Sequence, residues 1–175
     1  MALNQLVNWA ADGTASGMRE GIIEQVKRLG VAPHWKDIYT AYTLATVKHE
    51  TGNRFRPVKE IMASPNRQPK LYRRQQRYSP YFGRGLVQIT WKKNYEKYER
   101  LLAMPLIEHP EMVLRSDVSL FILVHGMYYG TFTGVGFDDY TNPEEDDFIE
   151  MREIVNGSDK AKLIAGYASQ YLKDF

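Results

Sequence analysis

The sequence predicts a mainly α-helical domain with a small β-hairpin insertion in its first half. Apolar residues recur at helical spacing along most of the 175 residues, whereas residues 53–80 contain four prolines that interrupt this pattern. The length suits one domain with a core of its own. The chain has no cysteine, which excludes a disulfide framework, thiolate metal sites and cysteine nucleophiles, and is typical of folding in a reducing compartment.

The N-terminal residues 1–17 end in a Gly- and Ser-containing stretch, so we expect a tail or linker before a single domain of residues 18–175. The first helix is predicted from an apolar stripe that stops before Gly30. The stripe consists of Ile22, Ile23, Val26 and Leu29. A second helix is expected over about 36–50, because apolar positions recur at the same spacing and Gly52 suits the position just past a helix end.

The proline-containing segment 53–80 is expected to form loops and short paired strands, and residues 86–89 are predicted to form a strand. The remaining elements are predicted to be helices at about 91–103, 117–129, 143–155 and 159–173. An acidic run follows Pro143, and it favours a helix start over a metal site because carboxylates are stabilised at the positive end of the helix dipole.

Glu50 is the first candidate for catalysis. It lies at the end of a predicted apolar helix, where the negative end of the dipole and the nearby packing are expected to raise the pKa of its carboxyl group. A carboxyl group that stays protonated near neutral pH can act as a general acid. The position also fits a glutamate that is simply exposed at a helix end.

Glu60 is the second candidate, because it follows a segment of extended character at residues 55–59. Across a loop it can face Glu50 with room for one water molecule, as in inverting glycosidases, whose two carboxyl groups are roughly 6.5–9.5 Å apart. Taken alone, Glu60 also fits a surface glutamate paired with Lys59 or Arg56. Two carboxyl groups in this arrangement predict acid hydrolysis of a glycosidic bond.

A glycine-flanked arginine, Gly83-Arg84-Gly85, predicts a flexible and closely approached turn. We expect Arg84 to pair with a catalytic carboxylate and keep it ionised. In the strand predicted after this turn, Gln88 and Thr90 project from one face, where an amide and a hydroxyl can bind a sugar or hold a water. An ordinary hairpin with glycines for turn geometry also fits.

The sequence lacks the motifs of several other catalytic classes. The four histidines do not have metal-ligand spacing, and the chain contains neither a nucleophile elbow nor a phosphate-binding loop. We therefore expect no metal and no cofactor. No apolar run approaches the roughly 20 residues that span a bilayer, so a membrane-embedded segment is not expected either.

Charge is distributed unevenly along the chain. Residues 1–100 contain 18 Lys and Arg against 8 Asp and Glu, whereas residues 101–175 contain 5 against 13. The basic excess is densest at Arg67, Lys70, Arg73, Arg74 and Arg77. Such a cluster can attract an anionic polymer of the cell envelope, although it also fits a solvated loop. Nucleic acid is not expected as a partner, because no nucleic-acid-binding motif accompanies the charge.

Taken together, these segments resemble the family 19 glycoside hydrolases, specifically their short, cysteine-free, lysozyme-like branch found among bacteriophage endolysins. The resemblance covers roughly residues 18–173. It is carried by Ala45-Thr46-Val47-Lys48-His49-Glu50-Thr51-Gly52, by Phe55-Arg56-Pro57-Val58-Lys59-Glu60, by Tyr81-Phe82-Gly83-Arg84-Gly85-Leu86-Val87-Gln88-Ile89-Thr90, by Asn94-Tyr95 and by Ile154-Val155-Asn156-Gly157.

The resemblance implies a lysozyme-like, two-lobed α+β domain with a cleft between the lobes, and inverting hydrolysis of a β-1,4 bond between amino sugars. Glu50 corresponds to the general acid and Glu60 to the general base. Thr90 corresponds to the hydroxyl residue that helps to hold the attacking water. The expected substrate-binding residues are Tyr81, Arg84, Gln88, Asn94 and Asn156.

The chain departs from the plant chitinases of the family, which space their two acids more widely, carry disulfides and have Tyr at the position of Lys93. These departures and the basic cluster favour peptidoglycan over chitin. We therefore expect an endolysin-type muramidase that hydrolyses the bond between N-acetylmuramic acid and N-acetylglucosamine and so lyses the cell wall. A chitinase acting on β-1,4-linked N-acetylglucosamine is the close alternative, and a non-catalytic wall-binding phage tail module is the alternative from another class.

The cellular setting follows from the N-terminus, which lacks the basic start and long apolar stretch of a signal peptide. We expect synthesis in the cytoplasm of a bacterial host, as a monomer. Action on the wall would then require release through a membrane-permeabilising holin, or delivery on a phage tail with the N-terminal segment as a tether.

Overall fold

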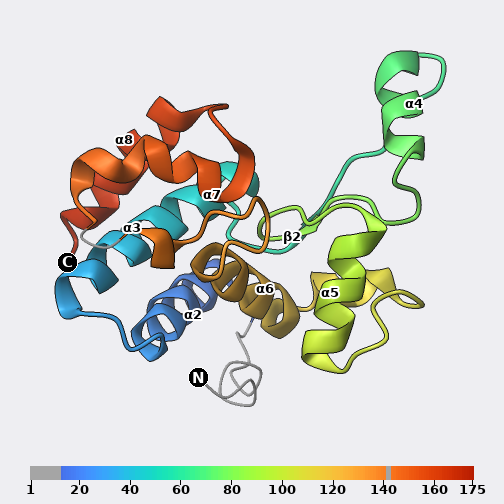
Figure 1. Ribbon diagram of the computed structural model, residues 1–175. Helices are drawn as coiled ribbons and strands as arrows, with labels where there is room; N and C mark the ends of the chain where they lie inside the picture. The colour runs from blue at the N-terminus through green and yellow to red at the C-terminus, as the bar shows by residue number, and fades with distance from the viewer. Residues whose placement is uncertain (1–12, 141–142) are drawn as a thin grey trace.

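The computed structural model describes residues 13–140 and 143–175, which form two lobes (Figure 1). One lobe contains the helices α2 (Ala15–Arg28), α3 (Pro33–Glu50), α6 (Ser116–Tyr128) and α8 (Ala161–Leu172). The other contains α4 (Pro69–Gln76), α5 (Lys92–Leu102) and the 3-10 helix η1 (Pro110–Leu114). The strands β1 (Val58–Lys59) and β2 (Arg84–Gly85) form a small antiparallel sheet. The predicted fold class, a mainly α domain with a small β insertion, is confirmed.

Two helices dominate the core. α6 is buried without interruption from Val118 to Val124, and a helix that is apolar on all sides is stable only when other elements surround it. α3 is buried from Ile38 to Val47 and packs against α2 and α8. This packing fixes the axis of α3, and Glu50 is the last residue of that helix.

The first helix begins earlier than predicted. Thr14 caps α2 by accepting a hydrogen bond from the backbone N–H of Gly17 at 2.9 Å, and Gly17 and Met18 are already buried. Such a cap satisfies an N–H group that has no partner inside the helix. The helix therefore starts inside the segment 1–17 predicted as a tail, and residues 1–12 of that prediction lie outside the described residues.

The β insertion differs from the prediction in two ways. The expected strand at residues 86–89 is wrong: residues 86–88 form a turn in which Gln88 has a φ of +52°, and only Ile89 pairs back, by a bridge to Arg84. The physical reason is that the N–H of Leu86 donates to Ser119 Oγ of α6 at 2.8 Å, not to a neighbouring strand. The segment 53–80, expected to contain only loops and short strands, also contains the helix α4.

α4 begins at one of the prolines that suggested a loop. Pro69 occupies the first helical position, where its missing N–H costs nothing and its fixed φ suits the helix. The helix connects the two strands and projects from the rest of the molecule (Figure 1).

The helix predicted over 143–155 is replaced by three short segments, η3 (Glu145–Phe148), η4 (Glu150–Arg152) and α7 (Glu153–Asn156). Phe148, Met151 and Ile154 are all buried. Residues three positions apart lie on the same side of a 3-10 helix, which has 3.0 residues per turn. In an α-helix the same residues would shift gradually around the helix axis. A further 3-10 turn, η2 (Phe137–Asp139), precedes this region.

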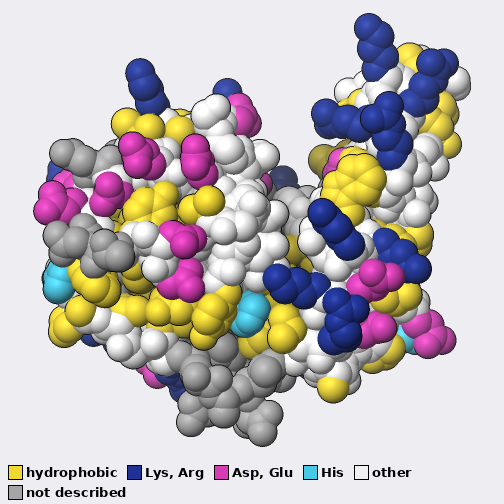
Figure 2. Space-filling model, viewed as in Figure 1, with side chains coloured by type: hydrophobic (Ala, Val, Ile, Leu, Met, Phe, Trp, Pro, Cys, Tyr) yellow, Lys and Arg dark blue, Asp and Glu magenta, His cyan; other side chains and the backbone are white. Residues whose placement is uncertain are grey.

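The surface is divided by charge, as the sequence indicated. Figure 2 shows Lys and Arg side chains gathered on the projecting α4, both signs of charge on the lobe below it, and mostly Asp and Glu side chains on the opposite lobe. A hollow separates α4 from that opposite lobe. Within the described ranges, no helix is both long and apolar enough to cross a bilayer.

Candidate active site

Glu60 lies directly after β1 and is held by an extensive set of hydrogen bonds. Its Oε1 accepts from Gln75 Nε2 and from the hydroxyl of Tyr78, each at 2.9 Å, and its Oε2 accepts from the N–H of Gly83 at 3.1 Å. The Glu60 N–H donates in turn to the Gly83 carbonyl at 2.7 Å. All three donors to the carboxylate are neutral, so they orient it without forming an ion pair.

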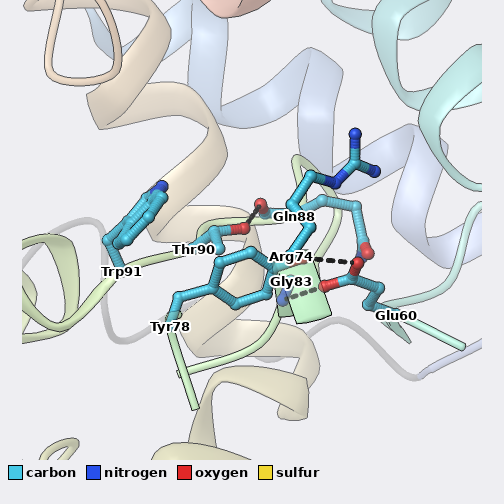
Figure 3. A pocket seen from close by; sticks show the side chains of 7 residues that line it. All are labelled: Glu60, Arg74, Tyr78, Gly83, Gln88, Thr90 and Trp91. Carbon is cyan, nitrogen blue, oxygen red and sulfur yellow. Dashed lines mark hydrogen bonds between the residues drawn. The ribbon is translucent and has the colours of Figure 1, made fainter. Parts of the chain in front are cut away.

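A cavity of about 430 Å³ opens beside this carboxylate (Figure 3). It is lined by Glu60, Arg74, Tyr78, Gly83, Gln88, Thr90 and Trp91. Thr90 Oγ1 donates to the Gln88 carbonyl at 2.9 Å, which leaves the lone pairs of the hydroxyl oxygen able to accept from a water. Trp91 is 47% exposed, and an exposed indole offers an apolar face on which a sugar ring can pack. The cavity therefore combines an oriented acid, a hydroxyl and an aromatic surface.

Gln88 and Thr90 line this cavity, but the backbone conformation that places them there differs from the predicted strand. They were expected to share one face of a strand, but Gln88 lies in a turn. Its side-chain Nε2 donates to the Val58 carbonyl at 2.7 Å and to the Gly85 carbonyl at 3.1 Å. The two residues do line one cavity, and the reason is this turn geometry and not strand alternation.

Gly83 is needed where the cavity wall is tightest. A Cβ atom at this position would lie 2.9 Å from Gln88 Oε1 and 3.4 Å from the Cβ of Glu60. A side chain would therefore displace either the amide of Gln88 or the backbone that carries Glu60.

Arg84 does not pair with a catalytic carboxylate, so that prediction is wrong. Its Nη1 donates to the carbonyls of Pro80 and Phe82, each at 3.1 Å, and to the hydroxyl of Tyr95 at 3.0 Å. The ion pairs among the described residues do not include it. Arg84 is only 5% exposed. Three acceptors of its own turn and of α5 bind its Nη1 in the interior, whereas its buried Nε has no partner among the described residues. Arg84 fixes the turn that carries Gly83 and leaves little surface for a sugar.

Glu50 lies on the other lobe, at the end of α3, and does not line the cavity beside Glu60. Its Oε1 accepts a hydrogen bond from Arg152 Nη2 at 3.0 Å. The side chain of Arg152 is 1% exposed and that of Glu50 is 17% exposed. Arg152 Nε also donates to the Asp159 carbonyl at 2.8 Å, so the guanidinium that orients Glu50 is itself fixed.

The connection between the two acids is rigid at its start. Thr51 Oγ1 donates to the Val47 carbonyl at 2.7 Å and accepts from the N–H of Phe55 at 3.0 Å. Phe55 is fully buried, and the guanidinium of Arg19 lies 4.2 Å from the centre of its ring. The chain that leaves α3 at Glu50 is therefore anchored in the core before it reaches β1 and Glu60.

The other predicted substrate-binding residues fall outside this cavity. The half-buried Tyr81 directs its hydroxyl to the carbonyl of Ile107 at 3.4 Å. Asn94 Nδ2 donates to the Thr90 carbonyl at 2.7 Å and so supports the start of α5. Asn156 is exposed at the end of α7, one helical turn after Arg152. Contact of these three residues with a substrate stays a prediction.

The sequence did not assign several residues to the site, namely Arg74, Gln75, Tyr78, Trp91 and Arg152, although Arg74 belonged to the predicted basic cluster. The first three were hidden because α4 was expected to be a loop, although Gln75 and Tyr78 have the spacing of one helical turn. Burial raises the pKa of the Tyr78 hydroxyl, and the neighbouring Glu60 raises it further. The sequence signal that could have revealed Arg152 is its position within a segment whose apolar residues recur every three positions and are buried.

Comparison with curated proteins finds plant endochitinases. No protein-family model matches the chain. One endochitinase of Arabidopsis thaliana is 37% identical over 81 residues, which are 46% of this chain and 28% of that protein. Another is 28% identical over 117 residues, which are 63% of this chain and 44% of that protein. The matches thus span less than half the length of these relatives.

Solved structures show the fold over nearly the whole chain. Chitinase C from Streptomyces griseus superposes with a TM-score of 0.67 and 18% identity, over 98% of this chain and 88% of that chain. A family 19, class IV chitinase from Zea mays gives a TM-score of 0.56 and 19% identity, over 98% of this chain and 89% of that chain. This chain therefore has the chitinase-like fold of the family 19 glycoside hydrolases, as its motifs indicated.

Proposed function

We propose that this protein is a chitinase-like glycoside hydrolase that cleaves the β-1,4 bond between N-acetylated amino sugars. The observation that carries the proposal is the setting of Glu60. Its carboxylate is oriented by Gln75, Tyr78 and Gly83 at the wall of a cavity that also contains the Thr90 hydroxyl. An acid held by neutral donors beside a second polar group suits a base that activates water.

In the proposed reaction, Glu50 is the general acid and Glu60 is the general base. Arg152 contacts Oε1 of Glu50, so Oε2 is the oxygen that can carry a proton to the leaving glycosidic oxygen. Glu60 accepts a proton from a water held by Thr90. This water attacks the anomeric carbon from the opposite face, and the product forms with inverted configuration. Both carboxyl groups reach one sugar only if the glycan lies across the hollow between the lobes.

Two substrates fit this chemistry. The similar proteins are named chitinases and endochitinases, which supports chitin, the alternative substrate expected from the sequence. Peptidoglycan is the second candidate, because Arg74, one of the basic residues of α4, lines the cavity. Peptidoglycan carries carboxylates, whereas chitin is neutral.

If peptidoglycan is the substrate, we propose the setting expected from the sequence. The protein would then be a muramidase of a bacteriophage that is made in the host cytoplasm. It would reach the wall through a holin or on a phage tail, and the basic residues Arg67, Lys70, Arg73, Arg74 and Arg77 would bind anionic polymers of the envelope.

Mass analysis of the products released from chitin oligomers and from purified peptidoglycan tests the proposal. Saccharides with new reducing ends from either polymer, absent with Glu60→Gln, are the expected result. Fragments that end in N-acetylmuramic acid would identify a muramidase, and fragments of N-acetylglucosamine alone would identify a chitinase. Binding to a polymer without any release of reducing ends would instead support the non-catalytic module and overturn the proposal.

A further inference from the structure

Arg74 is a cation in the cavity of Glu60 that does not neutralise any carboxylate of the described chain. It lines the cavity, yet the ion pairs among the described residues do not include it. Glu60 has no need of it as a counter-ion, because three neutral donors already bind that carboxylate. In Figure 3 the guanidinium of Arg74 points away from the Glu60 carboxylate.

The backbone position of Arg74 is fixed by its neighbour in the chain, while its side chain is exposed. Gln75 is buried, accepts from the N–H of Ala63 at 2.7 Å, and donates to Glu60 and to the carbonyl of Ile61, each at 2.9 Å. These bonds attach α4 to the segment that carries Glu60. The positive charge of Arg74 is close enough to Tyr78 to oppose the rise in the pKa of that hydroxyl. Arg73 lies on the same helix but does not line the cavity.

A neutral amino sugar offers this guanidinium only hydroxyl and acetamido oxygens, whereas a carboxylate on the glycan offers an opposite charge and a bidentate partner. We propose that Arg74 binds a carboxylate that the glycan carries next to the bond to be cleaved, and that it thereby selects acidic amino-sugar polymers over neutral ones. This inference rests on the proposed hydrolysis at the cavity of Glu60, and it assigns peptidoglycan as the preferred substrate class.

The test compares Arg74→Gln with Arg73→Gln, which removes the same charge from the same helix outside the cavity. The measured quantity is the ratio of kcat/KM on acidic glycan strands to kcat/KM on N-acetylglucosamine oligomers of equal length. We expect Arg74→Gln to lower this ratio about three- to tenfold, the range for one charged hydrogen bond at an accessible site. Arg73→Gln is expected to keep the ratio within twofold at 0.15 M salt, where distant charges are screened.

The source of the carboxylate is resolved by the choice of acidic substrate. In intact peptidoglycan the lactyl carboxyl is bonded to the stem peptide, so the free carboxylates belong to the peptide. Strands stripped of peptide by an amidase expose the lactyl carboxylate instead, and converting that group to an amide makes the strand neutral. If Arg74→Gln lowers kcat/KM on stripped strands, and this loss disappears after the carboxylate is converted to an amide, the lactyl group is the one that Arg74 binds. If Arg74→Gln lowers kcat/KM on intact peptidoglycan but not on stripped strands, Arg74 binds a carboxylate of the stem peptide.

Binding provides an independent readout. The affinities of the wild-type protein and of Arg74→Gln for acidic and neutral tetrasaccharides are measured by calorimetry, which needs no turnover. A fall in the ratio of acidic to neutral affinity that occurs only in Arg74→Gln supports the inference. If neither polymer is hydrolysed at the same time, only the proposed hydrolysis is overturned. Unchanged ratios in both assays, or an equal loss with Arg73→Gln, would overturn the role of Arg74 and leave the proposed hydrolysis standing.

Discussion

Arg152 Nη2 lies 3.0 Å from Oε1 of Glu50, and this ion pair joins the end of α3 to η4 across 102 positions of sequence. The arginine is almost fully buried, whereas the glutamate is partly exposed. Glu50 is therefore a fixed group, and in its ionised form it also compensates a buried cation. Catalysis and stability are coupled at this residue.

The first prediction follows from that coupling. Glu50→Gln keeps an oxygen that can accept from Arg152 but removes the negative charge, so we expect the free energy of unfolding to fall by about 1–3 kcal/mol. Hydrolysis should fall at least ~100-fold, because the amide cannot deliver a proton. Denaturant unfolding and an assay of reducing ends measure the two effects. The exposed Glu153→Gln, in neighbouring α7, should change stability by less than about 0.5 kcal/mol. An active Glu50→Gln protein would contradict its assignment as the acid.

The second prediction concerns the hydroxyl that orients Glu60. Tyr78→Phe removes one of the two hydrogen bonds to Oε1, so we expect kcat to fall about tenfold, the worth of one hydrogen bond to a charged group. KM should change little, since the lost contact is with the protein and not with the glycan. Tyr72→Phe, on the preceding helix α4, serves as the control. Equal kcat values for both variants would show that Tyr78 does not position the base.

The third prediction tests the tight wall of the cavity. Gly83→Ala places a methyl group 2.9 Å from Gln88 Oε1, which should displace the amide and reduce activity more than stability. The control is Gly166→Ala in α8, where a Cβ atom meets nothing within 4 Å. That substitution should stabilise the protein by roughly 0.5–1 kcal/mol, because alanine is the better helix former. Full activity in Gly83→Ala would show that this wall is not part of the site.

The fourth prediction concerns the pH dependence of stability. His125 packs against Phe121, with ring centroids 5.2 Å apart, and burial, with a smaller effect of Lys97, lowers its pKa from 6.5 to about 4. Between these values the unfolded chain binds a proton that the folded chain excludes. Neutral His125 therefore makes its full contribution to the free energy of unfolding above about pH 7, and this contribution is lost as the pH falls through 6.5 toward 4.

Thermal or denaturant unfolding at several pH values measures this effect. The wild-type protein should lose stability relative to His125→Phe on acidification, with a slope that approaches about 1.4 kcal/mol per pH unit. The exposed His34→Gln should follow the wild-type curve. A difference between wild type and His125→Phe that is constant from pH 7.5 to 5 would rule out the proposed linkage.

The helical part of the fold could be predicted from the sequence because its packing is periodic. α3, α5, α6 and α8 were placed within a few residues. α5 and α8 carry an apolar stripe near the 3.6-residue period, whereas α3 and α6 contain long runs that are buried on all sides. The segment 143–155 was misjudged because apolar positions three residues apart suit a 3-10 helix, and such a spacing is easily taken for an α-helix. α4 was missed because prolines were read as breakers, although Pro69 begins the helix.

The candidate site was predictable only in part. Glu60, Gln88 and Thr90 are brought to one cavity, as their motif suggested. The glycine-flanked Arg84 was expected to pair with a catalytic carboxylate, but its Nη1 donates to local carbonyls and to Tyr95 instead. The Arg152–Glu50 pair depends on two segments that only the tertiary fold brings together. Sequence spacing carries no information about it.

In the proposed mechanism, two carboxyl groups on opposite lobes hydrolyse an amino-sugar bond by direct attack of water. Proton NMR of the anomeric signals during the first minutes of cleavage of a chitin hexamer or a peptidoglycan strand tests it most directly, before the sugars equilibrate. New reducing ends should appear first as the α-anomer, and Glu60→Gln should give none. First appearance of the β-anomer, or an active Glu60→Gln protein, would contradict it.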